Sequence, residues 1–264
     1  MSQNIIIVAD IHCRDFYKPV LNIKDKRIVF LGDYMDLYGY EGTHDEDGIA
    51  NLEEIIDFAK NNSNVTLLTG NHDCSWIWSP LGFERTSYEF YNDLHRLYRD
   101  NITLFKPCLK VDNILFSHAG VCRGWIDSMN KLFKGKDSNF RLTESNIVPY
   151  IENEFELELQ HDTALGRGFY KYLESEIFCI GHSRGGDAPY GGPFWSDFNY
   201  DYWDPEGWNL IQIMGHTQRI VTGTLGINGN GYCVDSRAIF EYDSESQTVS
   251  LWQGENSEKS ESEE

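Results

Sequence analysis

The chain has 264 residues, a net charge of −20, 41% apolar residues and 14% aromatic residues. This apolar content is typical of one folded domain and excludes an intrinsically disordered chain. The negative charge argues against nucleic acid and anionic membranes as partners, and without an apolar stretch of ~18 residues or a basic signal sequence we expect a cytoplasmic protein.

The first third of the chain alternates short apolar runs with polar loops. The runs at residues 5–9, 27–31 and 65–68 are predicted to be buried strands, because each is apolar and is bounded by turn-forming residues. Between the second and the third run, apolar residues recur at helical spacing from Ile49 to Ala59. A crossover helix in this position predicts that the strands it joins are parallel.

The rest of the chain is predicted to contain helices and a second set of strands. A helix is predicted over residues 88–99, and residues 124–173 are mostly helical in pattern, although residues 155–159 alternate with period two and fit either structure. The predicted strands lie at residues 102–105, 108–111, 114–117, 176–180, 210–214, 232–234, 238–242 and 248–252. Glycine-rich turns such as residues 226–231 separate the last of these strands.

These elements predict an α/β fold in which two sheets pack as a sandwich flanked by helices over residues 1–252. Residues 253–264 are predicted to form an acidic, disordered tail, in which five Glu accompany Lys259. Residues 185–208 are rich in Gly, Pro and aromatic residues and are predicted to form an ordered loop over a site. The six cysteines include no C-x-x-C pair, so we expect free thiols.

Side chains suited to binding metal follow three of the predicted strands. Asp10 and His12 follow the first strand, the second ends in Gly-Asp-Tyr-Met-Asp at residues 32–36, and the third ends in Gly-Asn-His-Asp at residues 70–73. The carboxyl ends of parallel strands line one crevice, so these loops are predicted to converge. An isolated Asp or His at a strand end is more often part of a cap or a surface loop, but three such ends together favour a site.

Two further histidines have the same setting. His118, in Ser-His-Ala-Gly, and His216, in Gly-His-Thr, each end a hydrophobic strand and precede small residues. Carboxylates, an amide oxygen and imidazoles are ligands that suit Mn²⁺, Fe or Zn²⁺. Cys13 and Cys74 lie beside the candidate ligands but are interpreted as packing residues.

The ordered motifs Asp-x-His, Gly-Asp-x-x-Asp, Gly-Asn-His-Asp, His and Gly-His make the chain resemble the calcineurin-like metallophosphoesterases. They extend from Asp10 to His216, and details of three of them are most similar to the phosphoprotein-phosphatase branch and its bacterial and phage relatives. The resemblance implies the calcineurin-like β-sandwich. It also implies hydrolysis of phosphate monoesters by a hydroxide that bridges two divalent metal ions, for which we expect Mn²⁺, with Fe or Zn²⁺ as alternatives.

The same resemblance implies a role for each motif residue. Asp10 and His12 would hold one metal ion, Asn71, His118 and His216 the other, and Asp33 would bridge the two. His72 would donate a proton to the leaving oxygen, oriented by Asp36. On the residues alone, Asn71 could instead form a turn, and His72 could be a histidine that hydrogen-bonds to a metal ligand.

One departure from the resemblance concerns the substrate phosphate. Relatives usually carry Arg after the second aspartate of the second motif, whereas here Leu37 follows Asp36. Arg184 lies in a glycine-flanked loop and is the candidate substitute, with Asn71 as a second substrate-binding residue. Arg123 and Arg167 are further candidates, and Arg184 could equally form a surface salt bridge.

Two activities and one binding role are compatible with these features. The first is a serine/threonine protein phosphatase, which the branch resemblance implies. The alternative is a nucleotidase or dinucleoside-polyphosphate hydrolase, motivated by the missing Arg and by aromatic residues 194–208, which either stack a nucleobase or pack the core. A non-catalytic module is disfavoured by the intact ligand set, because clustered carboxylates and histidines are costly without metal. The expected partner is a phosphorylated substrate, either a phosphoprotein or a small phosphate ester.

Overall fold

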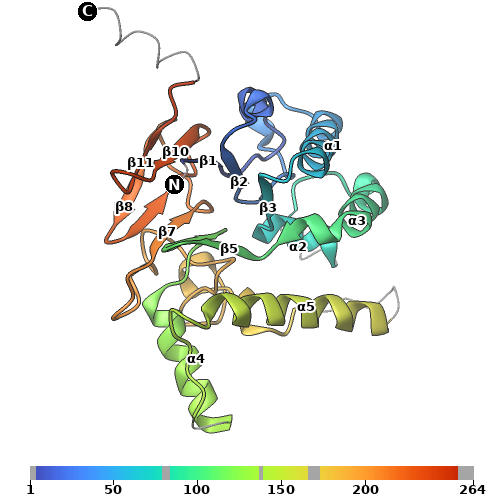
Figure 1. Cartoon of the computed structure of the whole chain (residues 1–264). Coiled ribbons are helices and arrows are strands. Elements are labelled where there is room, and N and C mark those ends of the chain that lie inside the picture. The colour runs from blue at the N-terminus through green and yellow to red at the C-terminus, as the bar shows by residue number, and fades with distance from the viewer. Residues whose placement is uncertain (1–3, 79–83, 137–138, 166–172, 255–264) are drawn as a thin grey trace, which may run out of the picture.

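Two β-sheets pack against each other at the centre of the chain, and helices flank them (Figure 1). The computed structural model describes residues 4–78, 84–136, 139–165 and 173–254. The strands are β1 (Ile5–Val8), β2 (Arg27–Phe30), β3 (Val65–Leu68), β4 (Phe105–Lys106), β5 (Cys108–Val111), β6 (Ile114–Ser117), β7 (Ile211–Met214), β8 (Gly226–Asn228), β9 (Gly231–Cys233), β10 (Ile239–Asp243) and β11 (Thr248–Leu251). The α-helices are α1 (Asp45–Asn61), α2 (Asn71–Ile77), α3 (Tyr91–Asp100), α4 (Arg123–Lys136) and α5 (Ile147–Leu165).

The first sheet has the strand order β11-β10-β1-β2-β3-β4, and β1 to β4 are parallel to one another. Helix α1 connects β2 to β3, as the apolar spacing in this segment predicts. The second sheet has the order β5-β6-β7-β9-β8, in which β6, β7 and β9 are parallel. The predicted α/β fold with two sheets and flanking helices is therefore confirmed.

Strand β1 shows why the central strands are apolar throughout. Ile5 and Ile7 belong to a core layer that also contains Phe116 and Ile213 of the second sheet. Ile6 belongs instead to the core that includes residues of α1. A strand buried on both faces needs apolar side chains at every position, and this explains the unbroken run in the sequence.

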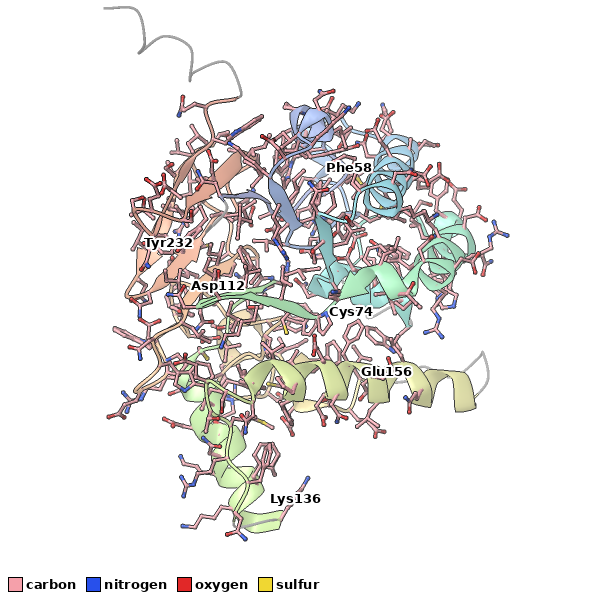
Figure 2. All side chains as sticks on the ribbon, in the orientation of Figure 1. Phe58, Cys74, Asp112, Lys136, Glu156 and Tyr232 are labelled. Atoms are coloured by element: carbon pink, nitrogen blue, oxygen red, sulfur yellow. The ribbon has the colours of Figure 1, made fainter. Side chains whose placement is uncertain are left out.

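The helices occupy distinct places around the sheets. Helices α1, α2 and α3 lie together beside β1, β2 and β3, whereas α5 runs across one end of the molecule (Figure 1). Helix α4 projects away from the body, with Lys136 near its far end (Figure 2). Over the part of the chain that the structure describes, no helix is long and apolar enough to cross a membrane.

The structure assigns one segment whose sequence pattern was ambiguous, and three other segments differ from their predictions. Residues 155–159 lie in α5, where Leu157 is exposed and the buried Glu158 accepts hydrogen bonds from the main chain of Glu174 and Ser175. An exposed leucine next to a buried glutamate is the reverse of what a helix usually shows, and this exchange made the segment resemble a strand with a period of two. Residues 176–180 begin with a 3₁₀ turn, Glu176–Phe178, and are not a strand, because a short buried apolar run does not distinguish the two.

The predicted strand at residues 102–105 is also mainly a 3₁₀ turn, Ile102–Leu104, which leads into β4. The predicted turn at residues 226–231 contains β8, a short edge strand that begins with glycine. All six cysteines are free, as expected. Residues 255–264 of the predicted tail lie outside the described residues.

Candidate active site

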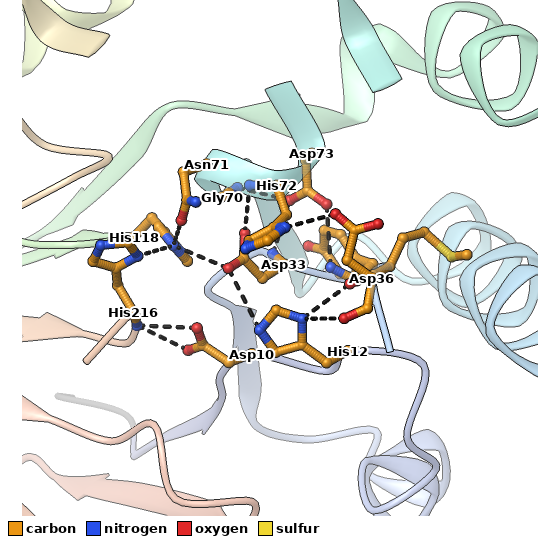
Figure 3. A network of polar contacts seen from close by, with 12 residues as sticks. Asp10, His12, Asp33, Asp36, Gly70, Asn71, His72, Asp73, His118 and His216 are labelled. Carbon is orange, nitrogen blue, oxygen red and sulfur yellow. Dashed lines mark hydrogen bonds and ion pairs between the residues drawn. The ribbon is translucent and has the colours of Figure 1, made fainter. Parts of the chain in front are cut away.

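The side chains predicted to bind metal meet at one edge of the two sheets (Figure 3). Asp10 and Asp33 follow β1 and β2, and Asn71 opens α2 just after β3. His118 and His216 follow β6 and β7 of the second sheet. Both sheets therefore contribute their strand ends to one site, as the positions of the motifs predict.

The turns that carry these side chains adopt an unusual backbone conformation. Asp10, His12, Asp33, Asp36 and His216 have positive φ angles of 49°, 45°, 55°, 69° and 64°. Asp and His enter this left-handed region more readily than most other non-glycine residues. The turns therefore reverse the chain sharply and still present a polar side chain at the point of reversal.

Two glycines allow the ends of β2 and β3 to approach each other. A Cβ atom on Gly32 would lie 2.3 Å from the main-chain nitrogen of Gly70, and one on Gly70 would lie 2.1 Å from Oδ1 of Asp33. Contacts this short are sterically forbidden, and a Cβ atom on Gly70 would also lie 2.5 Å from the main-chain nitrogen of Asp33, so both positions require glycine.

Asp33 lies at the centre of the site, between histidines from two different strand ends (Figure 3). Its Oδ2 is 3.7 Å from Nε2 of His12 and 3.4 Å from Nε2 of His118. Its Oδ1 accepts a hydrogen bond of 2.9 Å from the main-chain N–H of His72. One carboxylate thus faces both halves of the cluster.

The ligand atoms form two overlapping groups that could each hold a metal ion. One group is Asp10, His12 and Asp33, the other is Asp33, His118 and His216, and the ligand atoms in each lie within 4.8 Å of one another. Asn71 adds its Oδ1, which is 2.8 Å from Nε2 of His118. Asp33, the predicted bridging residue, is shared by both groups.

The histidine rings are oriented as metal binding requires. Nδ1 of His12 lies 3.0 Å from the carbonyl oxygen of Met35, and Nδ1 of His118 lies 2.8 Å from that of Leu31. A main-chain acceptor at Nδ1 keeps Nε2 available as a ligand. Nε2 of His216 is buried and has no hydrogen-bond partner within the described segments. Buried polar atoms are seldom left unpaired, so the donor set fits a pair of bound cations.

Burial and neighbouring charges shift the pKa values of the carboxyl and imidazole groups in the cluster. Burial, and next the neighbouring Asp235, raise the pKa of Asp10 well above its usual range. Burial lowers the pKa of His216, and Arg184 lowers it further. Asp33 is buried too, but the histidines around it, foremost His118, hold the pKa of its carboxyl well below its usual range. Divalent cations would stabilise both the ionised carboxylates and the neutral imidazoles.

His72 and Asp36 form a close pair beside Asp33. Nδ1 of His72 is 2.6 Å from Oδ2 of Asp36, whose carboxylate is fully buried. Burial opposes protonation of His72, but Asp33 and Asp36 outweigh this effect and raise the pKa of the imidazole. The structure thus holds a protonatable imidazole next to the candidate metal ligands.

Asp73 has a supporting role that the sequence analysis did not assign. Its Oδ2 accepts hydrogen bonds from the main-chain N–H groups of Asp33 (2.8 Å) and Gly70 (2.7 Å), and its Oδ1 accepts one from the Tyr98 hydroxyl (2.6 Å). Burial raises the pKa of Asp73 to about 6. The position of Asp73 directly after Asn71 and His72 could have predicted this role, since an aspartate in such a turn commonly accepts hydrogen bonds from the neighbouring backbone.

The predicted arginines lie in different surroundings. Nη2 of Arg184 donates to Oγ1 of Thr217 (2.9 Å) and to the carbonyl oxygen of His216 (3.3 Å), so Arg184 borders the site. Its Nε also lies 2.9 Å from Oδ2 of Asp197. Arg123 pairs on the surface with Glu206, and Arg167 lies outside the described residues.

Arg85 is a further arginine at the site that the sequence analysis did not identify. Its Nη2 is 3.2 Å from Nδ1 of His12 and donates to the carbonyl oxygen of Asp36 at 2.6 Å. Arg85 is 73 positions from His12, and it belongs to none of the motifs. No local pattern in the sequence predicts this contact, because it joins two segments that are far apart along the chain.

Comparisons with known proteins agree with this geometry. A family model described as calcineurin-like phosphoesterase matches residues 3–219. A solved structure described as a cold-active protein-tyrosine phosphatase of a psychrophilic Shewanella species has a TM-score of 0.55 and 15% identity, covering 96% of this chain and 81% of that chain. A second cold-active protein-tyrosine phosphatase structure has a TM-score of 0.56 and 16% identity, covering 96% and 80%.

At these identities the solved structures show a shared fold. A search of curated protein sequences finds no match. The family model spans every motif from Asp10 to His216, and the structure brings the same motifs to one place. The chain therefore belongs to the calcineurin-like phosphoesterase family and is a metal-dependent phosphatase.

Proposed function

We propose that this phosphatase hydrolyses phosphate monoesters of serine and threonine in proteins. The observation that carries the proposal is the pairing of His72 with Asp36, 2.6 Å apart, beside Asp33. A serine or threonine alkoxide is a poor leaving group and needs a proton, which an imidazolium held by a carboxylate can donate. A dinucleoside polyphosphate has a phosphate leaving group and needs such an acid less.

In this proposal the two overlapping ligand groups hold two divalent cations. Asp10, His12 and Asp33 would hold one cation, and Asp33 with Asn71, His118 and His216 would hold the other. When bound, such cations supply a nucleophile at neutral pH by lowering the pKa of water, and they offset charge on the phosphoryl oxygens. The protein sets the spacing through Asp33 and brings the protonated His72 to the leaving-group side.

Two further observations support a phosphoprotein substrate. The Shewanella structure, which shares the fold, is described as a protein-tyrosine phosphatase. In the aromatic loop, Phe194, Phe198 and Tyr202 are buried, and Phe194 packs against Phe178 with ring centroids 4.6 Å apart. These side chains fill the core, which weakens the case for a nucleobase platform, although Tyr200 and Trp203 are exposed.

The substrate proposal is tested by parallel assays on the Mn²⁺-loaded protein. We expect phosphoserine and phosphothreonine peptides to be hydrolysed with kcat/KM at least ~10-fold above that for a diadenosine polyphosphate, because only the peptides use the proton from His72 fully. The opposite ranking would identify a dinucleoside-polyphosphate hydrolase. No turnover of any phosphate ester, an aryl phosphate included, would contradict the whole proposal.

Arg184 is proposed to bind the substrate phosphate. We expect Arg184→Ala to reduce kcat/KM by ~10-fold or more and to weaken inhibition by free phosphate, because a guanidinium can contact two phosphoryl oxygens at once. Arg184→Lys should recover part of the loss, since an ammonium lacks the planar fork. The matched control is Arg123→Ala, which removes an exposed arginine paired with Glu206. Unchanged kinetics in Arg184→Ala would place the phosphate contact elsewhere.

A further inference from the structure

Asp36 connects two parts of the site through different atoms. Its carboxylate Oδ2 is paired with Nδ1 of His72 (2.6 Å), and its main-chain carbonyl oxygen lies 3.0 Å from Nδ1 of His12. The position of this one residue therefore affects both the proposed proton donor and a candidate metal ligand. Its φ angle of 69° lies in the left-handed region, which costs free energy for a residue other than glycine.

A separate segment supports Asp36 in this conformation. The main-chain N–H of Asp36 donates to Oγ1 of Thr86 (3.2 Å), and the main-chain N–H of Thr86 donates to Oδ1 of Asp36 (3.2 Å). Nη2 of Arg85 donates to the carbonyl oxygen of Asp36 (2.6 Å), and its Nε donates to that of Leu37 (2.8 Å). Two consecutive residues thus bind the N–H, the C=O and the carboxylate of Asp36.

The arrangement leaves each carboxylate oxygen of Asp36 with its own partner. Oδ1 accepts from Thr86 and Oδ2 pairs with His72, so the plane of the carboxylate is fixed from both sides. Thr86 is buried, and the Arg85 guanidinium stacks over the ring of Tyr38, 4.1 Å from its centroid. This packing restricts the segment to the place where it contacts Asp36.

We propose that Arg85 and Thr86 are positioning residues for catalysis: they hold Asp36 in its left-handed conformation and thereby orient both His72 and His12. This inference rests on the proposed function for the role of His72. Neither residue belongs to a motif that the family match implies, and both act through Asp36. A carboxylate that loses one fixed oxygen can rotate, and the imidazole that it holds then loses its alignment with the leaving oxygen.

The test compares the rates on an alkyl phosphate and on an aryl phosphate. A loss of stability or of metal lowers both rates together, whereas a misaligned His72 lowers mainly the rate on the alkyl phosphate. In Mn²⁺-loaded Thr86→Val, we expect kcat for a phosphoserine peptide to fall by ~10-fold or more and kcat for 4-nitrophenyl phosphate by less than ~3-fold, with both KM values and bound metal unchanged. Thr86→Ser keeps the hydroxyl and should restore most of the loss. Ser87→Ala, at the exposed neighbouring position, is the matched control.

Equal losses on both substrates, or no loss on either, would overturn the proposal for Thr86. If Thr86→Val does not fold, Arg85→Met alters an exposed side chain and provides a second measurement. A Mn²⁺ titration, which needs no turnover, should show weakening of one of two binding steps by ~10–100-fold, as expected when the support of a ligand is removed. An unchanged titration and an unchanged ratio of the two rates would show that Arg85 does not position Asp36.

The titration also separates this inference from the proposed function. If the wild-type protein binds two Mn²⁺ but hydrolyses no alkyl phosphate, the substrate proposal fails. A weakened binding step in Arg85→Met would then still support the positioning of His12 through Asp36.

Discussion

Replacement of Asp33 by Asn should abolish phosphatase activity and lower the bound metal to about one ion or none. Asp33 is the residue common to both ligand groups, and its Oδ2 faces His12 on one side and His118 on the other. An amide keeps the size of the side chain but loses the negative charge that two cations share. The measurement is metal content per folded chain, together with kcat on an aryl phosphate, where we expect a loss of at least ~10³-fold.

Asp112→Asn is the matched control for this experiment. Asp112 also has a positive φ, 54°, and follows a strand, but it lies in the turn between β5 and β6. The control should retain metal and activity, which separates the effect of the site from the effect of an amide in a left-handed turn. Two full equivalents of metal in folded Asp33→Asn would contradict the bridging role.

Replacement of His72 by Asn should have the second largest effect, and it should depend on the substrate. We expect both metal ions and the fold to remain, while kcat on alkyl phosphates falls by ~10²-fold or more, because His72 is the proposed proton donor. An activated aryl phosphate should lose far less, since its leaving group departs with little proton transfer. The two rates and the metal content are measured on the same preparation.

His95→Asn serves as the control for His72→Asn. His95 lies on α3 and its Nδ1 is 2.8 Å from the carbonyl oxygen of Trp76, so its replacement perturbs a histidine that belongs to neither ligand group. We expect both rates to stay near those of the wild type. Equal losses on alkyl and aryl phosphates in His72→Asn would remove His72 from the proposed role of acid.

The sequence predicted the parts of this site that depend on strand ends. Asp10, Asp33 and Asn71 each follow an apolar run, and parallel strands necessarily bring their carboxyl ends to one edge of a sheet. His118 and His216 join the site only because the strand ends of the second sheet lie beside those of the first. Local pattern could not predict this packing, and the resemblance to a family supplied it.

What the sequence could not predict are contacts made by segments without a pattern of their own. Arg85 and Thr86 reach Asp36 from a loop about fifty positions away, and neither residue type is unusual in a loop. Residues 155–159 were ambiguous for a related reason, because the buried carboxylate of Glu158 occupies a helix position where the pattern leads one to expect an apolar side chain. In both cases tertiary hydrogen bonds, which leave no local signature, determined the outcome.

The left-handed turns at the strand ends have a consequence for how the protein can change over generations. Each non-glycine residue held in this conformation costs on the order of 1–3 kcal/mol, so glycine at Asp10, Asp33, Asp36 or His216 would relieve local strain. Variants selected only for resistance to heat would therefore be enriched in replacements that remove candidate metal ligands or the carboxylate that pairs with His72. Selection for turnover must act against that tendency at every one of these turns. Packing in the cores of the two sheets then has to compensate for the free energy of folding that the strained turns cost.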